Sequence, residues 1–139
     1  MPDIEAFVVD ASISVKSCLG AGFASLVDAG RLVAPALLWS ETTSTLRELT
    51  YRGEISAQAG VIALSRLVEA PIDRVATSGL YRDATFIARR LGWAKTYDAE
   101  YVALALAMQV LLVTVDRRLA AGASGLVRVI APPGPADPA

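Results

Sequence analysis

Histidine is absent from this chain of 139 residues, and cysteine occurs once, as Cys18. The lack of histidine excludes a Ser-His-Asp triad, a histidine general base and a histidine-ligated metal. A single cysteine excludes an internal disulfide and a zinc site built from several cysteines. For catalysis near neutral pH, carboxylates and a hard metal ion are therefore the chemistry that remains.

Charged residues are scarce, at 19%, and the formal net charge is −1, so overall charge gives no indication of nucleic-acid binding. The basic residues are mostly arginine, which binds phosphate through a planar fork, and this permits RNA binding without indicating it. Hydrophobic residues make up 54% of the chain, more than is usual for a domain of this size. We therefore expect a tightly packed domain that also buries surface against a partner.

A long hydrophobic run of the kind that spans a membrane is also missing. The best candidate, from Tyr101 to Val115, contains Gln109 and is shorter than the ~20 residues that a bilayer core requires. A helix followed by a buried strand explains this segment better. The first residues, MPDIEAFVVD, carry acids where a signal peptide has basic residues. We therefore expect a cytoplasmic protein with no membrane association.

Apolar strand-like segments alternate with helical patterns, which predicts one α/β domain in three layers, α/β/α, around a central parallel sheet. The expected strands are residues 4–9, 32–34, 72–75, 110–113 and 127–130. The expected helices are residues 12–18, 23–29, 35–51, 55–69, 80–91, 97–108 and 117–121. We place the domain at residues 1–131 and expect the tail, residues 132–139, to be disordered.

Two details of the helices are testable. Ser12 and Thr96 stand where a helix N-cap is expected. In the helix at residues 55–69, periodicity predicts a buried face. The residues expected on or near that face are Ile62, Leu64, Leu67 and Val68.

Four acids are placed to meet at one edge of this sheet. Asp10 and Asp116 follow the first and fourth strands, and parallel sheets bind ligands outside the carboxyl ends of their strands. Asp98 lies in the first turn of the helix before the fourth strand, and Glu41 in the first half of the helix after the second. Clustered carboxylates are the ligands that Mg²⁺ and Mn²⁺ prefer.

Each acid also has a simpler interpretation. Asp10 and Asp116 both precede helices, so each fits an N-cap. Asp98 fits a residue that complements a helix dipole, and Glu41, which borders an apolar face, fits a solvated helical glutamate. Glu48 and Glu54 are interpreted as exposed charges.

Four segments carry a resemblance to a known family: VVDAS at 8–12, LVAPALLWSE at 32–41, YDAEYVALA at 97–105 and LVTVDRRL at 112–119. In this order and spacing they resemble the motifs of a PIN domain of the VapC toxin type. The resemblance covers nearly the whole chain, from Ile4 to Ile130. It departs at Ser17, where many relatives carry an aromatic residue, and at Ser44, where many carry asparagine.

The resemblance implies an endoribonuclease that cleaves RNA with Mg²⁺ or Mn²⁺. Ser12 and Thr114 match hydroxyls that support the metal site, although Thr114 also fits an ordinary strand residue. The residues that match the catalytic, metal-binding acids are Asp10, Glu41, Asp98 and Asp116. Three basic residues could contact RNA phosphate, but solvated surface charge is the preferred interpretation for each: Lys16, Arg117 and Arg118.

The family also implies partners: a VapB-like antitoxin, which would face the helix pair around residues 51–69, and a second copy of the chain in a homodimer. Two other functions stay open, a PIN nuclease that processes RNA without a toxin role and an inactive PIN-like binding module. A haloacid-dehalogenase-like phosphatase fits poorly, because that chemistry needs a second aspartate where Ser12 stands.

Overall fold

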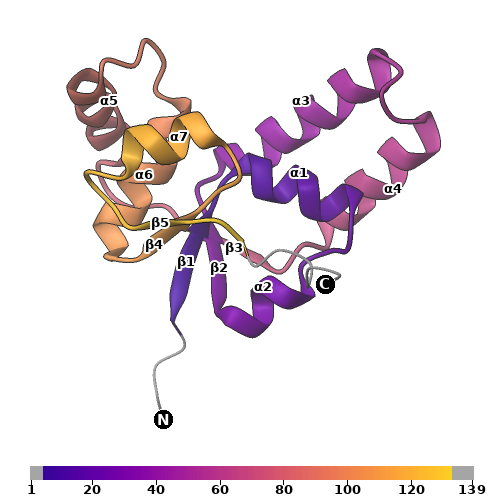
Figure 1. Cartoon of the computed structure of the whole chain (residues 1–139), viewed down its shortest axis with the longest axis horizontal. Coiled ribbons are helices and arrows are strands. Elements are labelled where there is room, and N and C mark those ends of the chain that lie inside the picture. Colours follow the sequence, from indigo (N-terminus) through magenta and orange to yellow (C-terminus); the bar gives the residue numbers. More distant parts are fainter. Residues whose placement is uncertain (1–4, 133–139) are drawn as a thin grey trace, which may run out of the picture.

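The computed structural model describes residues 5–132 and centres on a five-stranded sheet (Figure 1). All neighbouring strands in this sheet run parallel. The strands are β1 (Ala6–Val9), β2 (Arg31–Ala34), β3 (Ile72–Arg74), β4 (Leu111–Val113) and β5 (Val129–Ile130). The expected parallel sheet is confirmed. Of the expected tail, only Pro132 lies within the described residues, so that prediction stays open.

The order of the strands, β3-β2-β1-β4-β5, places β1 at the centre. From β1 the chain moves outward to β2 and β3, then returns to the other side of β1 and adds β4 and β5. The strand order therefore reverses between β1 and β4, which pair with Val8 opposite Leu112 and Val9 opposite Val113. A crevice at the carboxyl ends of such a strand pair is the usual ligand site of an open parallel sheet.

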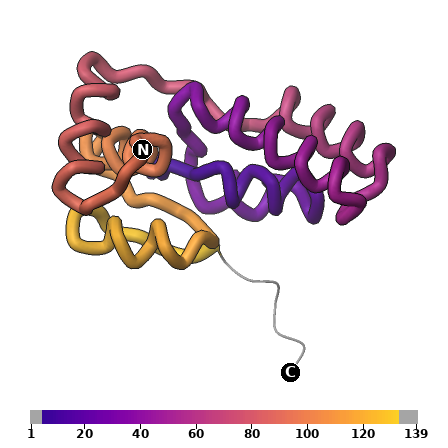
Figure 2. Tube along the Cα trace, turned by 90° about the horizontal axis from the view of Figure 1, so that it is seen from above, coloured from indigo at the N-terminus to yellow at the C-terminus, as the bar shows by residue number. Residues whose placement is uncertain are grey.

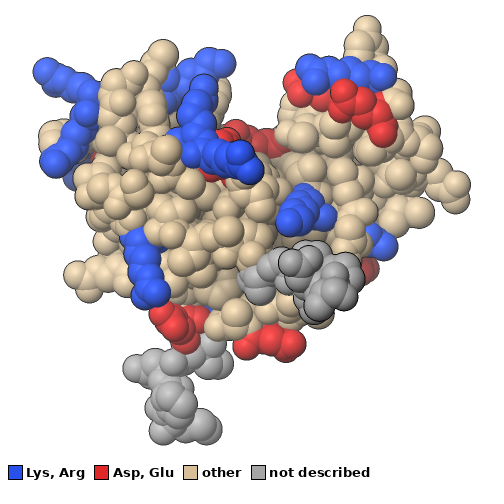
Figure 3. All heavy atoms as spheres, in the orientation of Figure 1, with Lys and Arg blue, Asp and Glu red and all other residues tan. Residues whose placement is uncertain are grey.

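Helices connect the strands and complete the three layers that the sequence predicts. Those of the first half are α1 (Ala11–Leu19), α2 (Ala24–Ala29), α3 (Leu37–Tyr51) and α4 (Ala57–Val68). Those of the second half are α5 (Leu80–Leu91), α6 (Tyr97–Met108) and α7 (Arg117–Ala123). Figure 1 shows α5, α6 and α7 as one lobe and α3 and α4 as an arm, and Figure 3 shows a notch between the two. Figure 2 shows α3 and α4 side by side, and both pack on α1.

The core is built from the strands and the helices that lie on them. Val8, Val9 and Val33 are completely buried, as the near-continuous apolar strands predict. Helix α6 packs on β1 and β4, and seven consecutive residues from Ala99 to Ala105 are buried in it. Each buried valine or leucine contributes roughly 1.5–3 kcal/mol, so this core holds the carboxyl ends of β1 and β4 in fixed positions.

Two local predictions are wrong. Ser12 is not the N-cap of α1. Asp10 caps that helix, and Ser12 lies within its first turn. Thr96 does stand at the N-cap of α6, as predicted, although its side chain makes no capping bond there.

The predicted face of α4 is also wrong, although Leu67 is buried as expected. The helix packs against α1 and α3, and its buried residues are Ala63, whose small side chain allows close approach, and Leu67. The three other residues expected near the buried face are exposed: Ile62, Leu64 and Val68.

The segment 101–115 folds as the end of α6 followed by β4, as expected. Within residues 5–132 no helix combines the length and the apolar character that crossing a bilayer requires.

Candidate functional site

Asp10 lies at the carboxyl end of β1 and is 4% exposed. Its Oδ1 accepts hydrogen bonds from the Ser12 hydroxyl, at 2.6 Å, and from the Ile13 amide, at 3.1 Å. Its Oδ2 accepts a hydrogen bond from the Thr114 hydroxyl, at 2.5 Å. The capping interpretation and the site interpretation of Asp10 are therefore compatible, since the cap fixes the carboxylate at the strand edge.

The two hydroxyls expected to support the site both reach Asp10, and each also joins β1 to the segment after β4. The Ser12 hydroxyl accepts from the Val115 amide at 3.2 Å, and Thr114 Oγ1 accepts from the Asp116 amide at 3.0 Å. The two hydroxyl oxygens are themselves 3.2 Å apart. This network turns the backbone after β4 so that Asp116 follows directly beside Asp10.

Asp116 caps α7, as its simpler interpretation predicts. Its Oδ1 accepts from the amides of Arg118, at 2.9 Å, and Leu119, at 3.1 Å. Within residues 5–132 its Oδ2 has no hydrogen-bond donor among the protein groups, which leaves that oxygen available to a ligand. Burial is the main cause that raises the pKa of Asp10, and the negative charge of Asp116 raises it further. The two carboxylates are therefore close enough to repel each other.

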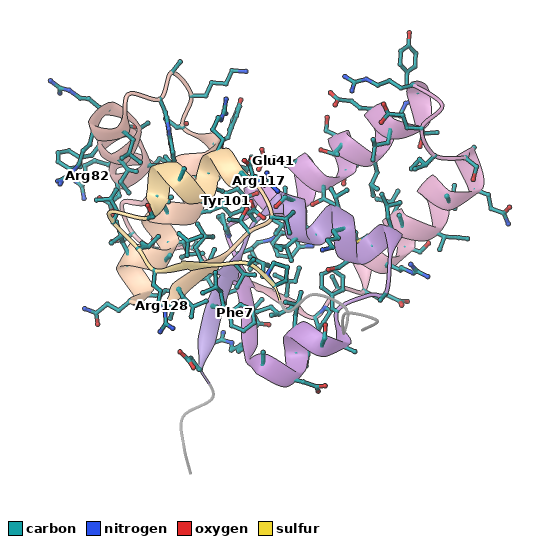
Figure 4. The ribbon with its side chains drawn as sticks, viewed as in Figure 1. Phe7, Glu41, Arg82, Tyr101, Arg117 and Arg128 are labelled. Atoms are coloured by element: carbon teal, nitrogen blue, oxygen red, sulfur yellow. The ribbon has the colours of Figure 1, made fainter. Side chains whose placement is uncertain are left out.

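Glu41 enters the site from α3 and is held by a residue of α6. The Tyr101 hydroxyl donates a hydrogen bond of 2.5 Å to Glu41 Oε1. Tyr101 is 1% exposed, so its ring is anchored in the core beneath the site. Figure 4 shows Glu41 between the α5–α7 lobe and α3, with Tyr101 below it.

Asp98 lies one helical turn before Tyr101 on α6, and a third of its side chain is exposed. The nearest cation is the guanidinium of Arg118, with Nη2 at 3.8 Å from Oδ2. Because the Arg118 side chain is 87% exposed, this pair is a weak surface ion pair that leaves most of the negative charge uncompensated. Asp98 and Glu41 both line a cleft of about 500 Å³.

The four acids influence one another. Burial raises the pKa of Glu41, the Tyr101 hydrogen bond lowers it, and the charges of Asp98 and Asp10 raise it again. Burial also raises the pKa of Asp98, as does the charge of Asp116, while Arg118 lowers it. Figure 3 shows acidic atoms at the base of the notch, beneath basic side chains. Such a group of carboxylates is unfavourable unless protons or cations neutralise it.

As they stand, the side chains do not yet form a closed metal site. Within residues 5–132 no three acidic or cysteine side chains lie close enough together to coordinate one metal ion. The donor chemistry nevertheless suits a hard divalent cation, because all the donors are carboxylate oxygens and the arginine paired with Asp98 is largely exposed to solvent.

Sequence reasoning missed two residues of this region. Tyr101 was part of a motif but had no assigned role, although its spacing of three from Asp98 places both on one helix face. Glu100 is 8% exposed, and burial raises its pKa, with a further contribution from the charge of Glu41. The sequence carries no signal that separates Glu100 from an ordinary exposed glutamate in the first turn of a helix.

Comparison with known proteins adds to this geometry. The model of the PIN domain family matches residues 7–124. Ribonuclease VapC9 of Mycobacterium tuberculosis is 40% identical over 113 residues, which is 81% of this chain and 87% of that protein. Ribonuclease VapC1 of the same organism is 38% identical over 119 residues, covering 82% of this chain and 88% of that protein. The crystal structure of PAE2754 from Pyrobaculum aerophilum superposes with a TM-score of 0.69 at 24% identity, covers 91% of this chain and 90% of the other, and shows the same fold.

Proposed function

This chain belongs to the PIN domain family, and from that premise we propose that it is a divalent-metal-dependent endoribonuclease and the toxin of a type II toxin–antitoxin pair. The similarity to VapC ribonucleases supports RNA as the substrate. The observation that carries the proposal is the meeting of acids from four separate segments. The charges of these acids affect one another's pKa values, and Thr114 connects the Asp10 carboxylate to the Asp116 amide.

The residues proposed to hold Mg²⁺ or Mn²⁺ and to be catalytic are Asp10, Glu41, Asp98 and Asp116. When bound, such an ion neutralises the phosphodiester and activates a water for in-line attack. Asp10 would suit a metal ligand because two hydroxyls and one amide fix both of its oxygens. Asp98 would suit a second ligand because it is partly exposed and the arginine paired with it is largely in solvent.

The protein's own contribution is to hold these carboxylates in place before substrate arrives. Ser12 and Thr114 orient Asp10, and Tyr101 orients Glu41 from the buried side of the site. Hydrogen bonds from these donors favour the ionised carboxylates and so oppose the effect of burial on the pKa values of Asp10 and Glu41. Carboxylates that are both ionised and fixed bind a hard cation with little reorganisation.

The exposed surface of the arm formed by α3 and α4 is evidence for an antitoxin partner. Its outer face carries apolar side chains that the core leaves exposed, with Val61 at 66% and Val68 at 78%. Exposed apolar patches of this kind commonly mark the sites where proteins bind other proteins. We propose that a VapB-like antitoxin binds this arm and that the toxin forms a homodimer.

The test compares the wild-type protein with Asp10→Asn on a mixed RNA pool. Asparagine also caps helices, so the variant is expected to keep α1 while losing the charge that the metal needs. We expect cleavage by the wild type with Mn²⁺ or Mg²⁺, and none with EDTA or with the variant. Equal cleavage by both proteins would overturn the nuclease proposal, and intact RNA with both would favour the inactive binding module.

A further inference from the structure

The cleft beside Glu41 and Asp98 has a wall of aromatic and basic residues that the metal chemistry does not use. Its volume is about 500 Å³, and its other lining residues include Trp93, Lys95 and Tyr97, from the loop between α5 and α6 and the start of α6. A cleft of this size is within the range of sites for small ligands and single nucleotides.

This wall is fixed in place. Gly92 ends α5 in the left-handed region, with φ of 73°, and the Trp93 amide then donates to the Ala88 carbonyl at 2.8 Å. The Trp93 ring lies directly against Gly122 of α7, where an added Cβ would come within 2.5 Å of Cζ2. Since Trp93 is held between the core and α7, the residues that follow it start from a rigid base.

Tyr97 occupies the first position of α6, next to Asp98, and remains 52% exposed. Within the described part of the chain its hydroxyl takes no part in a side-chain hydrogen bond, and Tyr97 is one of the residues that line the cleft. An exposed aromatic ring on a rigid base gives a stacking surface at low entropic cost. Nucleobases stack on such rings whatever their sequence.

The cleft is lined by charges of both signs. The first group is the carboxylates of Glu41 and Asp98, and the second is the exposed cations of Lys95 and Arg118, of which Arg118 Nη2 lies 3.8 Å from Asp98 Oδ2. A polyanion is repelled by the first group and attracted by the second. A nucleic acid strand that reaches the acids therefore has its flanking phosphates beside the cations.

We propose that this cleft is a nucleotide subsite for single-stranded RNA, in which Tyr97 stacks on a base next to the bond to be cut and Lys95 binds the adjoining phosphate. The inference deepens the proposed function, since it rests on RNA being the substrate of the adjacent acids. It assigns a role to Gly122 as well, because that glycine gives Trp93 the room that keeps the wall rigid.

The first test measures binding without cleavage. A short fluorescent single-stranded RNA of randomised sequence is titrated with Asp10→Asn protein that carries, in addition, Tyr97→Ala, Tyr97→Phe or the control Tyr51→Ala. Tyr51 is 79% exposed and lies ten residues beyond Glu41 on α3, about 15 Å away at the rise of a helix. We expect Tyr97→Ala to weaken binding about five- to twenty-fold, with Tyr97→Phe and Tyr51→Ala close to the parent. A further variant, Tyr97→Ile, removes the aromatic ring while keeping bulk at this position.

A second test separates base stacking from phosphate binding. Removal of one phosphate contact by Lys95→Gln should reduce the slope of log affinity against log salt concentration by about 0.7, whereas Tyr97→Ala should leave the slope unchanged. On a ribose-phosphate oligomer without bases, Tyr97→Ala should have no effect and Lys95→Gln should keep its effect.

The outcomes distinguish the subsite from the nuclease proposal. If the wild type cleaves RNA but Tyr97→Ala and Tyr97→Ile bind it as well as Tyr51→Ala does, the subsite is wrong and the nuclease proposal stands. If the wild type cleaves nothing but Tyr97→Ala still weakens RNA binding selectively, the subsite stands and the nuclease proposal is wrong. If the wild type does not cleave RNA and the Asp10→Asn parent does not bind it, both are overturned.

Discussion

The hydroxyl of Thr114 donates a hydrogen bond of 2.5 Å to Oδ2 of Asp10, across a separation of 104 positions in the chain. The same oxygen of Thr114 accepts from the amide of Asp116 at 3.0 Å. The Thr114 side chain therefore links two of the proposed metal ligands. It also connects the carboxyl end of β1 to the carboxyl end of β4. Both partners of this bond are buried, Thr114 at 3% exposure and Asp10 at 4%.

Thr114→Val keeps the shape of the side chain and removes this link. Leaving Asp10 Oδ2 without its donor should lower the free energy of unfolding by about 1–3 kcal/mol. It should also reduce RNA cleavage about tenfold, because the carboxylate is held less firmly. Denaturant unfolding and initial cleavage rates measure the two effects.

The matched control is Thr43→Val, which removes an exposed hydroxyl that donates to the Trp39 carbonyl within α3. This change should leave unfolding and cleavage within error of the wild type. If both threonine variants behave alike, the link between Thr114 and Asp10 contributes nothing specific to the site.

Tyr101→Phe removes the hydroxyl that donates to Glu41 and leaves the ring in the core. That hydrogen bond lowers the pKa of Glu41, so its loss should raise the pKa further above the ordinary value. Since the metal binds the ionised carboxylate, the acid limb of the cleavage rate should move to higher pH. The measurement is the pH profile of cleavage at fixed Mn²⁺, with Tyr51→Phe as the control.

A purely structural role for Tyr101 gives a different result. The variant would then lower the melting temperature and the rate at every pH, with no shift of the acid limb. That outcome would remove Tyr101 from the positioning of Glu41.

The pH dependence of stability follows from the raised pKa values of Asp10, Glu41 and Asp98. A carboxyl group with a raised pKa in the folded state stabilises the fold below its unfolded pKa, and this contribution is lost as pH rises through the folded value. For these three groups, metal-free protein in EDTA should therefore lose stability between mildly acidic and neutral pH. Added Mn²⁺ should raise the melting temperature most at neutral pH, where the carboxylates are ionised.

Thermal melting in EDTA and in excess Mn²⁺, at a series of pH values, measures this directly. Asp10→Asn should show a smaller loss of stability over the same pH range. A melting temperature in EDTA that is the same for wild type and variant at every pH would show that Asp10 does not contribute in this way.

Gly122→Ala tests the packing of α7 on the loop after α5. Alanine normally stabilises a helix relative to glycine by about 0.5–1 kcal/mol. Here the new Cβ would lie 2.5 Å from the Trp93 ring, so the variant should instead be destabilised, by about 1–3 kcal/mol. The control is Gly125→Ala, where an added Cβ meets nothing within 4 Å. A Gly122→Ala protein at least as stable as wild type would contradict this packing.

Much of the fold follows from local pattern in the sequence. The helices at Leu80–Leu91 and Tyr97–Met108 have the predicted bounds, because strong helix patterns end at Gly92 and at the start of an apolar strand. Asp10 and Asp116 lie at neighbouring strand ends for a reason also visible in the sequence, since the strands they follow are apolar and parallel.

Other features depend on tertiary contacts that local pattern does not contain. The buried face of α4 is set by close packing of Ala63 on the neighbouring helices, which hydrophobicity alone ranks below the exposed Val68. The bond between Tyr101 and Glu41 joins residues 60 positions apart, and its existence depends on the angle between α3 and α6. Ser12 was misassigned because a hydroxyl in the first turn of a helix resembles a cap, whereas here it donates to the true cap, Asp10.

Isothermal titration calorimetry with Mn²⁺ shows whether carboxylates from separate segments share one divalent cation. The comparison is between wild type, Asp10→Asn, Asp98→Asn and the control Asp28→Asn, an exposed acid on α2. We expect Asp10→Asn and Asp98→Asn each to weaken Mn²⁺ binding at least tenfold, and Asp28→Asn to bind as the wild type does. If both site variants keep the wild-type affinity, these acids do not share an ion.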